Sequence, residues 1–366
     1  MDLAVQENRP FFSIVISCYN SRDTLGPLLQ SLVDQELSQE ELEIIISDDH
    51  STDSYEDIVE QFQDVLNIKR TQTEYNCCPG NTREAGAQVA TGTWLCFSDH
   101  DDKFVPGALQ YLKTFLKTNK ERYYICTSFY EVNENEELIQ NIIASKSGGW
   151  THGKFYNLDN LWKTYNVHYK KDLKSHEDVY LTSVINCILD QIHTRGENAG
   201  TYIDDLFTYM WFNRPNSESH KRQEDNINFL EKRFIDYIQA TGYVYLNYYK
   251  EGALPYKRAK QFLLDSILLC YFYSESFFFY NPTSYVKENF VFLGNYVNYI
   301  KETFNLTNEN IIQYAAADRA FAYNEALQSS NIGTGGLIPN HTLLEWLYSL
   351  DSGFFKSPEI SCFYIK

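Results

Sequence analysis

The fold class follows from the stretch Phe11-Phe12-Ser13-Ile14-Val15-Ile16-Ser17-Cys18-Tyr19-Asn20. Its first seven residues form a nearly continuous apolar run, which predicts a strand that is buried on both faces of a parallel sheet. Apolar residues then recur at helical spacing over residues 24–35, and a second apolar run covers residues 42–47. The order of strand, helix and strand predicts a βαβ unit.

The alternation of strand and helix continues along the first half of the chain. Residues 55–66 and 81–90 have helical patterns, and residues 68–71 and 93–98 have the patterns of short strands. We therefore predict an α/β fold with a doubly wound sheet. Ligands of such sheets gather beyond the carboxyl ends of the strands. Polar side chains follow three of these ends: Tyr19 and Asn20, Asp48 and Asp49, and an acidic turn, Asp99-His100-Asp101-Asp102.

The composition changes after about residue 215, where amphipathic helical patterns replace the alternation. These patterns cover residues 226–241, 256–273, 285–304 and 310–328. We predict two domains, a sheet domain over residues 1–220 and a mostly α-helical domain over residues 221–366. The candidate site residues lie in the first domain, so we expect the second to select the acceptor or to mediate self-association into a homo-oligomer.

Charge and composition exclude several classes of protein. The chain has 366 residues, with 31 basic and 49 acidic side chains and a net charge of −18, which makes nucleic acid an unexpected partner. Residues 1–10 do not resemble a secretory signal, and no stretch approaches the ~20 apolar residues that span a bilayer. The eight cysteines include no CxxC pair, which favours reduced thiols. We expect a cytoplasmic protein and leave contact with a membrane surface open.

Three carboxylates leave the sheet together at the acidic turn, after the apolar residues 94–97. Like charges this close are unfavourable unless a cation compensates them, and hard oxygen ligands suit Mg²⁺ or Mn²⁺ shared with substrate phosphates. The same residues could instead cap the helix that follows, before Pro106. Taken alone, the turn leaves both interpretations open.

Five motifs in order along the chain resemble the family 2 glycosyltransferases of the GT-A fold. They are Cys18-Tyr19-Asn20, the D-D-x-S-T-D segment of residues 48–53, the stretch of residues 82–94 that begins Thr82-Arg83-Glu84, the D-x-D-D turn of residues 99–102, and His176-Glu177-Asp178. The resemblance implies a Rossmann-like mixed sheet flanked by helices. It also implies a metal-dependent sugar transfer from a nucleotide sugar.

The resemblance further implies roles for individual residues. The implied nucleotide-binding residues are Tyr19, Asn20, Asp48, Asp49, Asn76, Arg83 and Asp99. Among them a carboxylate would read the uracil N3–H, Arg83 would lie near the base or the phosphates, and Asp99 would lie by the ribose. The implied metal ligands are Asp101, Asp99 and, from a later loop, His220. A Mg²⁺ or Mn²⁺ ion there would stabilise the charge of the departing nucleoside diphosphate.

The reaction itself is assigned to Asp178 with Glu177. In an inverting transfer one positioned carboxylate suffices as the base, and we expect Asp178 to be that base. Glu177 would orient Asp178 or bind a sugar hydroxyl. The alternative is a helix-capping role, because the pair comes directly before the helical pattern of residues 179–189.

Some positions differ from the residues that are usual in the family, and others allow two interpretations. His50 stands where Gly is usual, and His100 stands where Ser is usual. The His100 imidazole could hydrogen-bond a carboxylate or ligate the ion. Trp150 and His152 match a strand near the donor sugar, and Arg214 lies in the stretch that matches a loop closing over the diphosphate. Each of these three could equally be a framework residue.

We therefore predict an inverting glycosyltransferase of the hexosyl or N-acetylhexosaminyl type. It would move the sugar of a UDP-sugar to a hydroxyl of a cell-surface or capsular glycan, with protein or a modified DNA base as the alternative acceptor. A non-catalytic nucleotide-sugar-binding scaffold is disfavoured by the intact set of Asp99, Asp101 and Asp178. A nucleotidyltransferase would need a Gly-rich basic loop after the first strand, and Tyr19-Asn20-Ser21-Arg22 is not one.

Overall fold

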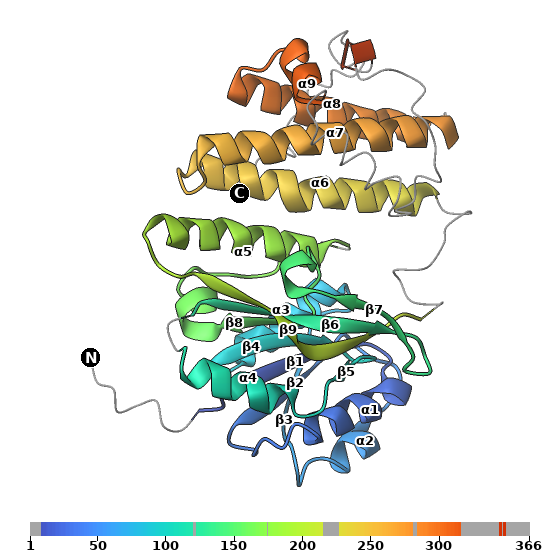
Figure 1. Ribbon diagram of the computed structural model, residues 1–366. Coiled ribbons are helices and arrows are strands. Elements are labelled where there is room, and N and C mark those ends of the chain that lie inside the picture. Colours follow the sequence, from blue (N-terminus) through green and yellow to red (C-terminus); the bar gives the residue numbers. More distant parts are fainter. Residues whose placement is uncertain are drawn as a thin grey trace. The chain divides into compact units, whose positions relative to one another are not determined.

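The computed structural model describes residues 9–119, 122–173, 175–214, 227–280, 284–315, 344–345 and 347–348. Contacts between residues divide the chain into two compact units, Met1–Lys221 and Arg222–Lys366. The first unit holds a sheet with flanking helices, and the described part of the second is helical (Figure 1).

The described residues of the first unit form a nine-stranded sheet. Its strands are β1 (Phe12–Cys18), β2 (Leu42–Asp48), β3 (Asn67–Gln72), β4 (Trp94–Asp99), β5 (Lys103–Phe104), β6 (Tyr124–Val132), β7 (Leu138–Ile142), β8 (Lys154–Asn157) and β9 (Gly200–Phe212). The spatial order is β3-β2-β1-β4-β8-β6-β9-β5, and β7 pairs with β6. The first four strands in this order are parallel, whereas β8 is antiparallel to both its neighbours. The sheet is therefore mixed, and the predicted fold class is confirmed.

Strand β1 lies inside the sheet, between β2 and β4, and its side chains are buried on both faces. Phe12, Ile14 and Ile16 belong to one apolar core together with leucines of α1 (Arg22–Val33) and α4 (Ala108–Lys117). On the other face Val15 contacts α3 (Pro79–Val89), where a Cβ atom placed on Gly86 would lie 2.3 Å from Val15 Cγ1. Helix α3 can therefore pack this closely on the sheet only because residue 86 has no side chain.

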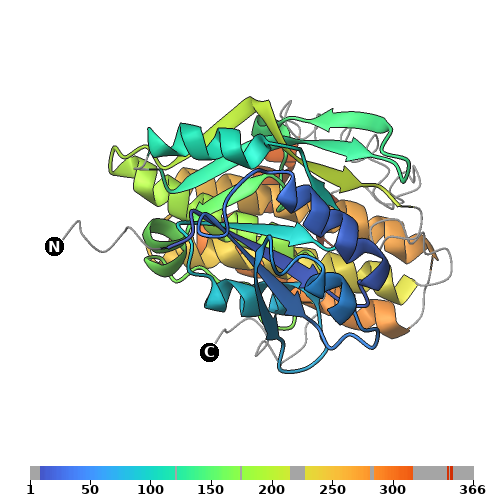
Figure 2. The same cartoon turned by 90° about the horizontal axis from the view of Figure 1, so that it is seen from below.

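Two further helices complete the first unit. The short helix α2 (Glu56–Glu60) contributes Val59 to the same core as α1. Figure 2 shows the blue helix α1 in front of the sheet. Helix α5 (Glu177–Thr194) begins against α3, since a Cβ on Gly80 would lie 3.1 Å from Glu177 Cβ. A 3₁₀ turn, Ala144–Lys146, and a π-helical turn, Leu158–Lys163, lie between the later strands.

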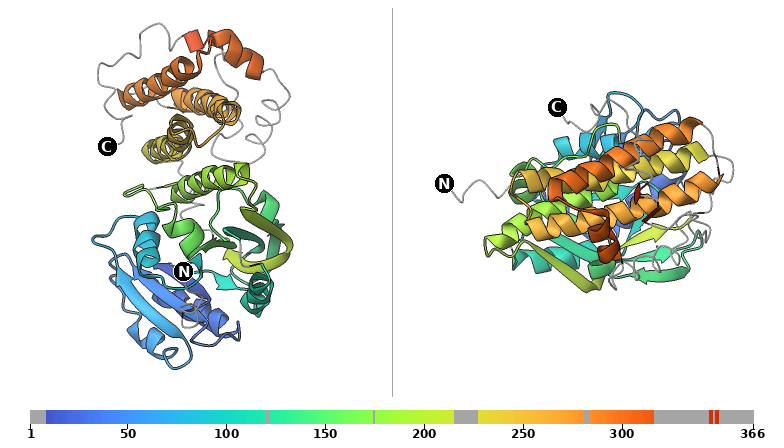
Figure 3. Two further views of the ribbon diagram at one scale, coloured as in Figure 1. Left: turned by 90° about the vertical axis from the view of Figure 1, so that its left-hand side faces the viewer. Right: turned by 90° about the horizontal axis from the view of Figure 1, so that it is seen from above.

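The described part of the second unit consists of α6 (Ile227–Lys250), α7 (Tyr256–Tyr280), α8 (Ser284–Phe304) and α9 (Asn308–Ala315). Helix α7 contacts the other three, and Figure 3 shows α6, α7 and α8 side by side. Inside this unit Tyr296 donates to or accepts from Ser266 at 2.7 Å. None of the helices in the described ranges has the length and apolar character needed to span a bilayer.

Most predicted elements of the first half are present, with one clear error. The helix predicted over residues 55–66 is wrong in length, because α2 ends at Glu60. From there Gln61, Phe62 and Val65 make three-residue turn bonds, Gln61 N to Ile58 O, Phe62 N to Val59 O and Val65 N to Phe62 O, and the chain then enters β3. The helical pattern of residues 310–328 corresponds to α9 up to Ala315, and the rest of it lies outside the described residues.

Candidate active site

The parallel strands end in register, and this brings the predicted site residues to one edge of the sheet. Cys18 at the end of β1 pairs with Asp48 of β2, and Ser17 pairs with Asp99 of β4. The loops that follow these strands therefore start at the same level. This is the edge at which parallel α/β sheets bind their ligands.

Asp49 follows β2 and is held by hydrogen bonds from the loop of residues 73–78. Its carboxylate is buried and accepts hydrogen bonds from Thr73 Oγ1 at 2.8 Å and from the Cys77 amide at 3.2 Å. The side-chain amide of Asn76 donates to the Asp49 carbonyl at 2.6 Å. Asp48 instead accepts from the Ser51 amide at 3.0 Å, which closes the turn after β2. The loop of residues 73–78 is thus fixed to the end of β2 through Asp49.

Tyr19 and Asn20 follow β1 at the same edge. The Tyr19 side chain is 49% exposed, so it is accessible to a ligand. Asn20 has a φ of 50°, and its side-chain oxygen accepts from the Thr52 amide at 2.8 Å. His50 likewise has a φ of 59°, a backbone conformation that explains why Gly would be usual there.

The three carboxylates of the acidic turn have different partners. Asp99 accepts from Arg83 Nη2 at 2.5 Å. Asp101 is paired with Arg214, whose Nη2 also donates to the Asp101 carbonyl at 2.6 Å. Asp102 is buried and accepts from Tyr209 Oη at 2.8 Å and from the Phe212 amide at 2.9 Å. Burial and the neighbouring Asp101 and Asp99 raise the pKa of Asp102 well above its ordinary value, so the negative charge of the turn lies on Asp99 and Asp101, which are each paired with an arginine.

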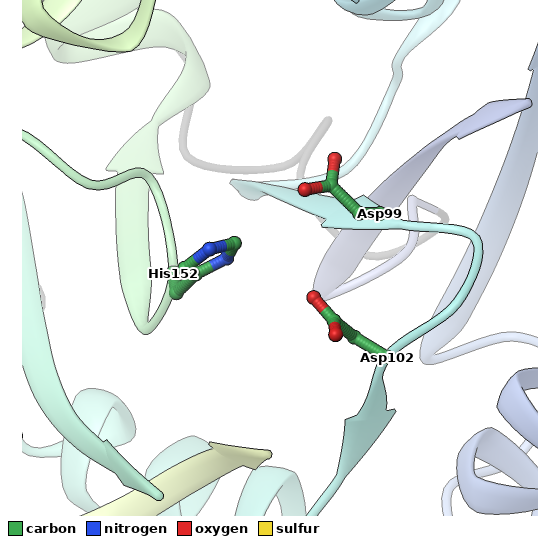
Figure 4. Close-up of side chains that lie close together, drawn as sticks. All are labelled: Asp99, Asp102 and His152. Carbon is green, nitrogen blue, oxygen red and sulfur yellow. The ribbon is translucent and has the colours of Figure 1, made fainter. Parts of the chain in front are cut away.

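Asp99, Asp102 and His152 form a group that could hold a metal ion, with one ligand atom of each within 4.8 Å of the others. Figure 4 shows the His152 ring pointing toward the two carboxylates. His152 is buried and stacks on Tyr209 with 5.1 Å between ring centroids. Burial lowers the pKa of His152 to about 4, so the imidazole is neutral near pH 7 and has a lone pair to give.

The resemblance implied Asp101, Asp99 and His220 as the metal ligands, and it matched His152 only to a strand near the donor sugar. The group with Asp102 and His152 was missed because these residues lie 50 positions apart and meet only through the pairing of β4 with β8. His100 is directed elsewhere, since its Nδ1 lies 2.7 Å from Thr24 Oγ1. His220 lies outside the described residues.

Arg83 connects the acidic turn with the predicted catalytic pair. Its Nη2 binds Asp99, and its Nη1 donates to Glu177 Oε1 at 2.8 Å. Burial opposes the charge on Arg83, but the attraction of Asp99 and Glu177 raises its pKa well above the ordinary value. Burial likewise opposes ionisation of Asp99, and the attraction of Arg83 outweighs it and lowers the pKa of Asp99. Arg83 and Asp99 are thus both charged.

Asp178 lies in the first turn of α5, next to this ion pair. The N-terminal cap of α5 is His176, and Asp178 accepts from the Val179 amide at 2.7 Å. Burial first, and the charge of Glu177 second, raise the pKa of Asp178 to about 7. The capping Asp considered from the sequence is therefore not at the cap position. A carboxyl group with a pKa near neutrality is suited to general-base catalysis.

Aromatic rings pack beside His152, whose ring centroid lies 6.2 Å from that of Trp211. Trp150 is 39% exposed and lies 5.9 Å from Trp211, between ring centroids, with the rings tilted by 32°. The Arg214 guanidinium lies 5.1 Å from the centre of the Phe212 ring. Behind them Lys154 is buried and donates to the Gly148 carbonyl at 2.7 Å, and burial lowers its pKa to about 8.

Comparisons with known proteins agree with the motifs. The family model described as Glycosyl transferase family 2 matches residues 13–172, which confirms the predicted resemblance. The poly(ribitol-phosphate) beta-N-acetylglucosaminyltransferase TarS of Staphylococcus aureus is 38% identical over 92 residues, 25% of this chain and 16% of that protein. The poly(ribitol-phosphate) beta-glucosyltransferase of Bacillus spizizenii is 39% identical over 112 residues, 30% of this chain and 17% of that protein.

The chain thus spans about a sixth of the length of these two curated relatives. Among solved structures, S. aureus TarS 1-349 superimposes with a TM-score of 0.60 at 18% identity, covering 94% of this chain and 90% of that chain. The same fragment in complex with UDP-GlcNAc gives the same TM-score. At this identity the likeness establishes the shared fold, that of a GT-A protein followed by a helical region.

Proposed function

We take as our premise that residues 13–172 belong to glycosyl transferase family 2, and propose that the chain is an inverting glycosyltransferase. It moves the sugar of a UDP-sugar to a hydroxyl of a glycan acceptor, a cell-surface or capsular polysaccharide. The observation that carries the proposal is the bridge through Arg83, which holds the Asp99 turn and the Glu177–Asp178 pair in one site. A donor site and a base in that arrangement are what a transfer from a nucleotide sugar needs.

We assign the donor nucleotide to the loops after β1 and β2. Tyr19 is accessible there, and Asp49 and Asn76 are held by the loop of residues 73–78. Asn20 and Asp48 close the neighbouring turns, so their part in binding is to shape the pocket. A UDP-sugar is supported by the UDP-GlcNAc complex of a protein with the same fold and by the glucosyl and N-acetylglucosaminyl transfer in the names of the relatives.

The chemical step uses Asp178 as the base. The acceptor hydroxyl loses its proton to the Asp178 carboxylate while its oxygen attacks the anomeric carbon. The bond from that carbon to the diphosphate oxygen breaks on the opposite face, and UDP leaves with the electron pair. Arg214, which pairs with Asp101 at the acidic turn, would stabilise the negative charge that develops on the diphosphate. Single displacement at this carbon inverts its configuration.

The test is the Asp178→Asn variant. Since asparagine has nearly the same shape but cannot take the proton, we expect turnover to fall by roughly 10² to 10⁴-fold while the affinity for UDP stays unchanged. UDP release from UDP-GlcNAc or UDP-glucose measures turnover, and calorimetric titration measures affinity. The exposed Asp205→Asn serves as the matched control. A normal rate in Asp178→Asn would mean that another group is the base.

A divalent ion fits the acidic turn by the chemistry of its side chains. Asp99 and Asp101 offer carboxylates that are each 31% exposed, and Asp102 with His152 adds an oxygen and a neutral imidazole nitrogen. Hard oxygens with one imidazole suit Mg²⁺ or Mn²⁺. We propose Asp99 and Asp101 as the residues that hold it. When bound, the ion would supply positive charge for the leaving diphosphate.

Calorimetric titration of UDP with and without Mn²⁺ tests this assignment. We expect Mn²⁺ to strengthen UDP binding and Asp101→Ala to remove that gain. His152→Phe keeps a stacked ring but no ligand atom, so retention of the gain in this variant would exclude the group with Asp102. Equal UDP affinity with and without Mn²⁺ in the unmodified protein would contradict metal dependence.

We propose that the helical second unit selects the acceptor or mediates self-association. The support is that every residue assigned to the donor, the ion or the base, His220 included, lies within the first unit, Met1–Lys221. The remaining helices are therefore available for a role that varies with the acceptor.

A further inference from the structure

The segment that leads into α5 is tied to α3 at several points. The Tyr169 amide donates to Glu84 at 3.0 Å, Glu177 pairs with Arg83, and Gly80 leaves room for the Glu177 side chain. All three partners on α3 lie within five residues of one another. Helix α3 thus serves as a support for the chain immediately before and at the proposed base.

Asp172 joins this segment to two other parts of the first unit by hydrogen bonds. Its Oδ1 accepts from Tyr75 Oη at 2.6 Å and from Asn81 Nδ2 at 3.0 Å, and its amide donates to Asn81 Oδ1 at 3.0 Å. The backbone of Asp172 has a φ of 61°, in the left-handed region. The two-way bond with Asn81 fixes both the side chain and the backbone of Asp172 on the first turn of α3.

Tyr75 brings the donor loop into the same arrangement. It belongs to the loop of residues 73–78, in which Asn76 and Cys77 bind Asp49. The Tyr75 ring also lies 5.5 Å from Lys171 Nζ, beside Asp172. One carboxylate therefore joins the loop assigned to the nucleotide, the start of α3 and the segment that carries the base.

We propose that Asp172 is a positioning residue, which clamps the segment of residues 167–173 between Tyr75 and Asn81 and so places Asp178 relative to the bound donor. The inference rests on the proposed function, because it needs Asp178 as the base. The clamp lies at the surface, with Tyr75 40% exposed, and exposed pairs contribute little to stability. Its effect should therefore appear in the geometry of the reaction rather than in folding.

Two substitutions of Asp172 distinguish the effect of its acceptor oxygen on kcat from the effect of its backbone conformation. Asp172→Gly tolerates the left-handed φ but removes the oxygen, whereas Asp172→Asn keeps an oxygen that can accept from Tyr75 and Asn81. We expect kcat to fall about tenfold in Asp172→Gly, since small misplacement of reacting groups is costly, and to be largely restored in Asp172→Asn. The Kd for UDP should stay within about twofold in both, so kcat and binding respond differently.

The matched control is Asn166→Gly, at another position of positive φ in the same connection whose side chain makes no hydrogen bond among those the structure describes. Hydrogen exchange of residues 167–173 should quicken in Asp172→Gly and not in Asp172→Asn. If Asp178→Asn abolishes turnover but Asp172→Gly leaves kcat unchanged, the clamp is wrong and the proposed function stands. Unchanged turnover in Asp178→Asn would instead overturn the proposed function. If kcat falls equally in Asn166→Gly and Asp172→Gly, the effect comes from loop flexibility and the clamp is wrong.

Discussion

Arg83 has the central place among the charged residues of the site, because two acidic side chains from different elements share its guanidinium. Asp99 comes from β4 and Glu177 from α5, and the Arg83 side chain is only 6% exposed. A buried arginine needs such partners, since an unpaired charge there would be strongly unfavourable. The ion pairs therefore fix the distance between the acidic turn and the proposed catalytic pair, Glu177 and Asp178, before any ligand binds.

Burial and the charge of Glu177 together set the pH range in which Asp178, the proposed base, is ionised. Burial and Glu177 raise the pKa of Asp178 to about 7, and a base must be ionised, so kcat should rise as the pH increases through about 7 and then level off. Glu177→Gln removes the neighbouring negative charge, which lowers the pKa of Asp178 and moves the rise to lower pH. A pH profile of kcat measures this, with exposed Glu60→Gln as control. A shift to higher pH would contradict the assignment.

At this scale the sequence predicted residue types better than partners. The motifs indicated Asp99, Glu177 and Arg83 as site residues, but the resemblance placed Arg83 by the nucleotide, and its two ion pairs follow from the closeness of α3 to α5. The contacts of Asp172 could not be predicted either, because Tyr75 and Asn81 lie more than 90 residues away in the chain. Whether Tyr19, Asn20, Asp48 and Asp49 contact the nucleotide stays a prediction.

At the scale of elements, β2 is anchored at its amino end by a buried carboxylate, far along the strand from the site. Glu43 is fully buried and accepts from Lys69 Nζ at 2.6 Å and from the amides of Thr91 at 2.6 Å and Gly92 at 2.9 Å. Burial opposes its ionisation, but these donors prevail and lower the pKa of Glu43 below 4.5. Glu43 thus joins β2, β3 and the loop before β4.

Glu43→Gln should reduce the free energy of unfolding by about 2–4 kcal/mol, because the amide NH₂ would face donors and leave a buried polar group unsatisfied. Since the pKa of Glu43 is lowered on folding, its contribution is present above pH 4.5 and is lost as the pH falls through the folded-state pKa. The difference between variant and parent in urea unfolding should therefore shrink at low pH. Exposed Glu40→Gln is the control, and an equally large loss there would contradict the argument.

The elements themselves were predictable where local pattern and burial agree. The continuous apolar runs of β1 and β2 gave two strands that differ by one residue at most at each end. Strands β5, β6, β7 and β9 were not predicted, because they lie in the mixed part of the sheet beyond β4, where pairing with distant segments decides the structure. Strand β9, for example, has mixed exposure along its length and pairs with β6 in parallel and β5 in antiparallel orientation.

At the scale of the whole molecule, the site belongs entirely to the first unit of a strongly acidic chain. An overall charge of −18 would repel a nucleotide diphosphate, so local cations must compensate. Arg83 and Arg214 lie at the acidic turn and provide that local charge. The net charge of the chain therefore does not predict the nucleotide ligand, whereas the five ordered motifs do.

The central claim, inverting transfer from a UDP-sugar, is tested most directly by the configuration of the released sugar. UDP-GlcNAc is α-linked, so slow hydrolysis with water in place of the acceptor should release the β-anomer first, before mutarotation equilibrates it. Proton NMR during the first minutes of the reaction distinguishes the two anomeric protons by their coupling. We expect β-GlcNAc from the unmodified protein and a greatly slowed release of GlcNAc from Asp178→Asn. Initial release of the α-anomer would contradict a single displacement with Asp178 as the base.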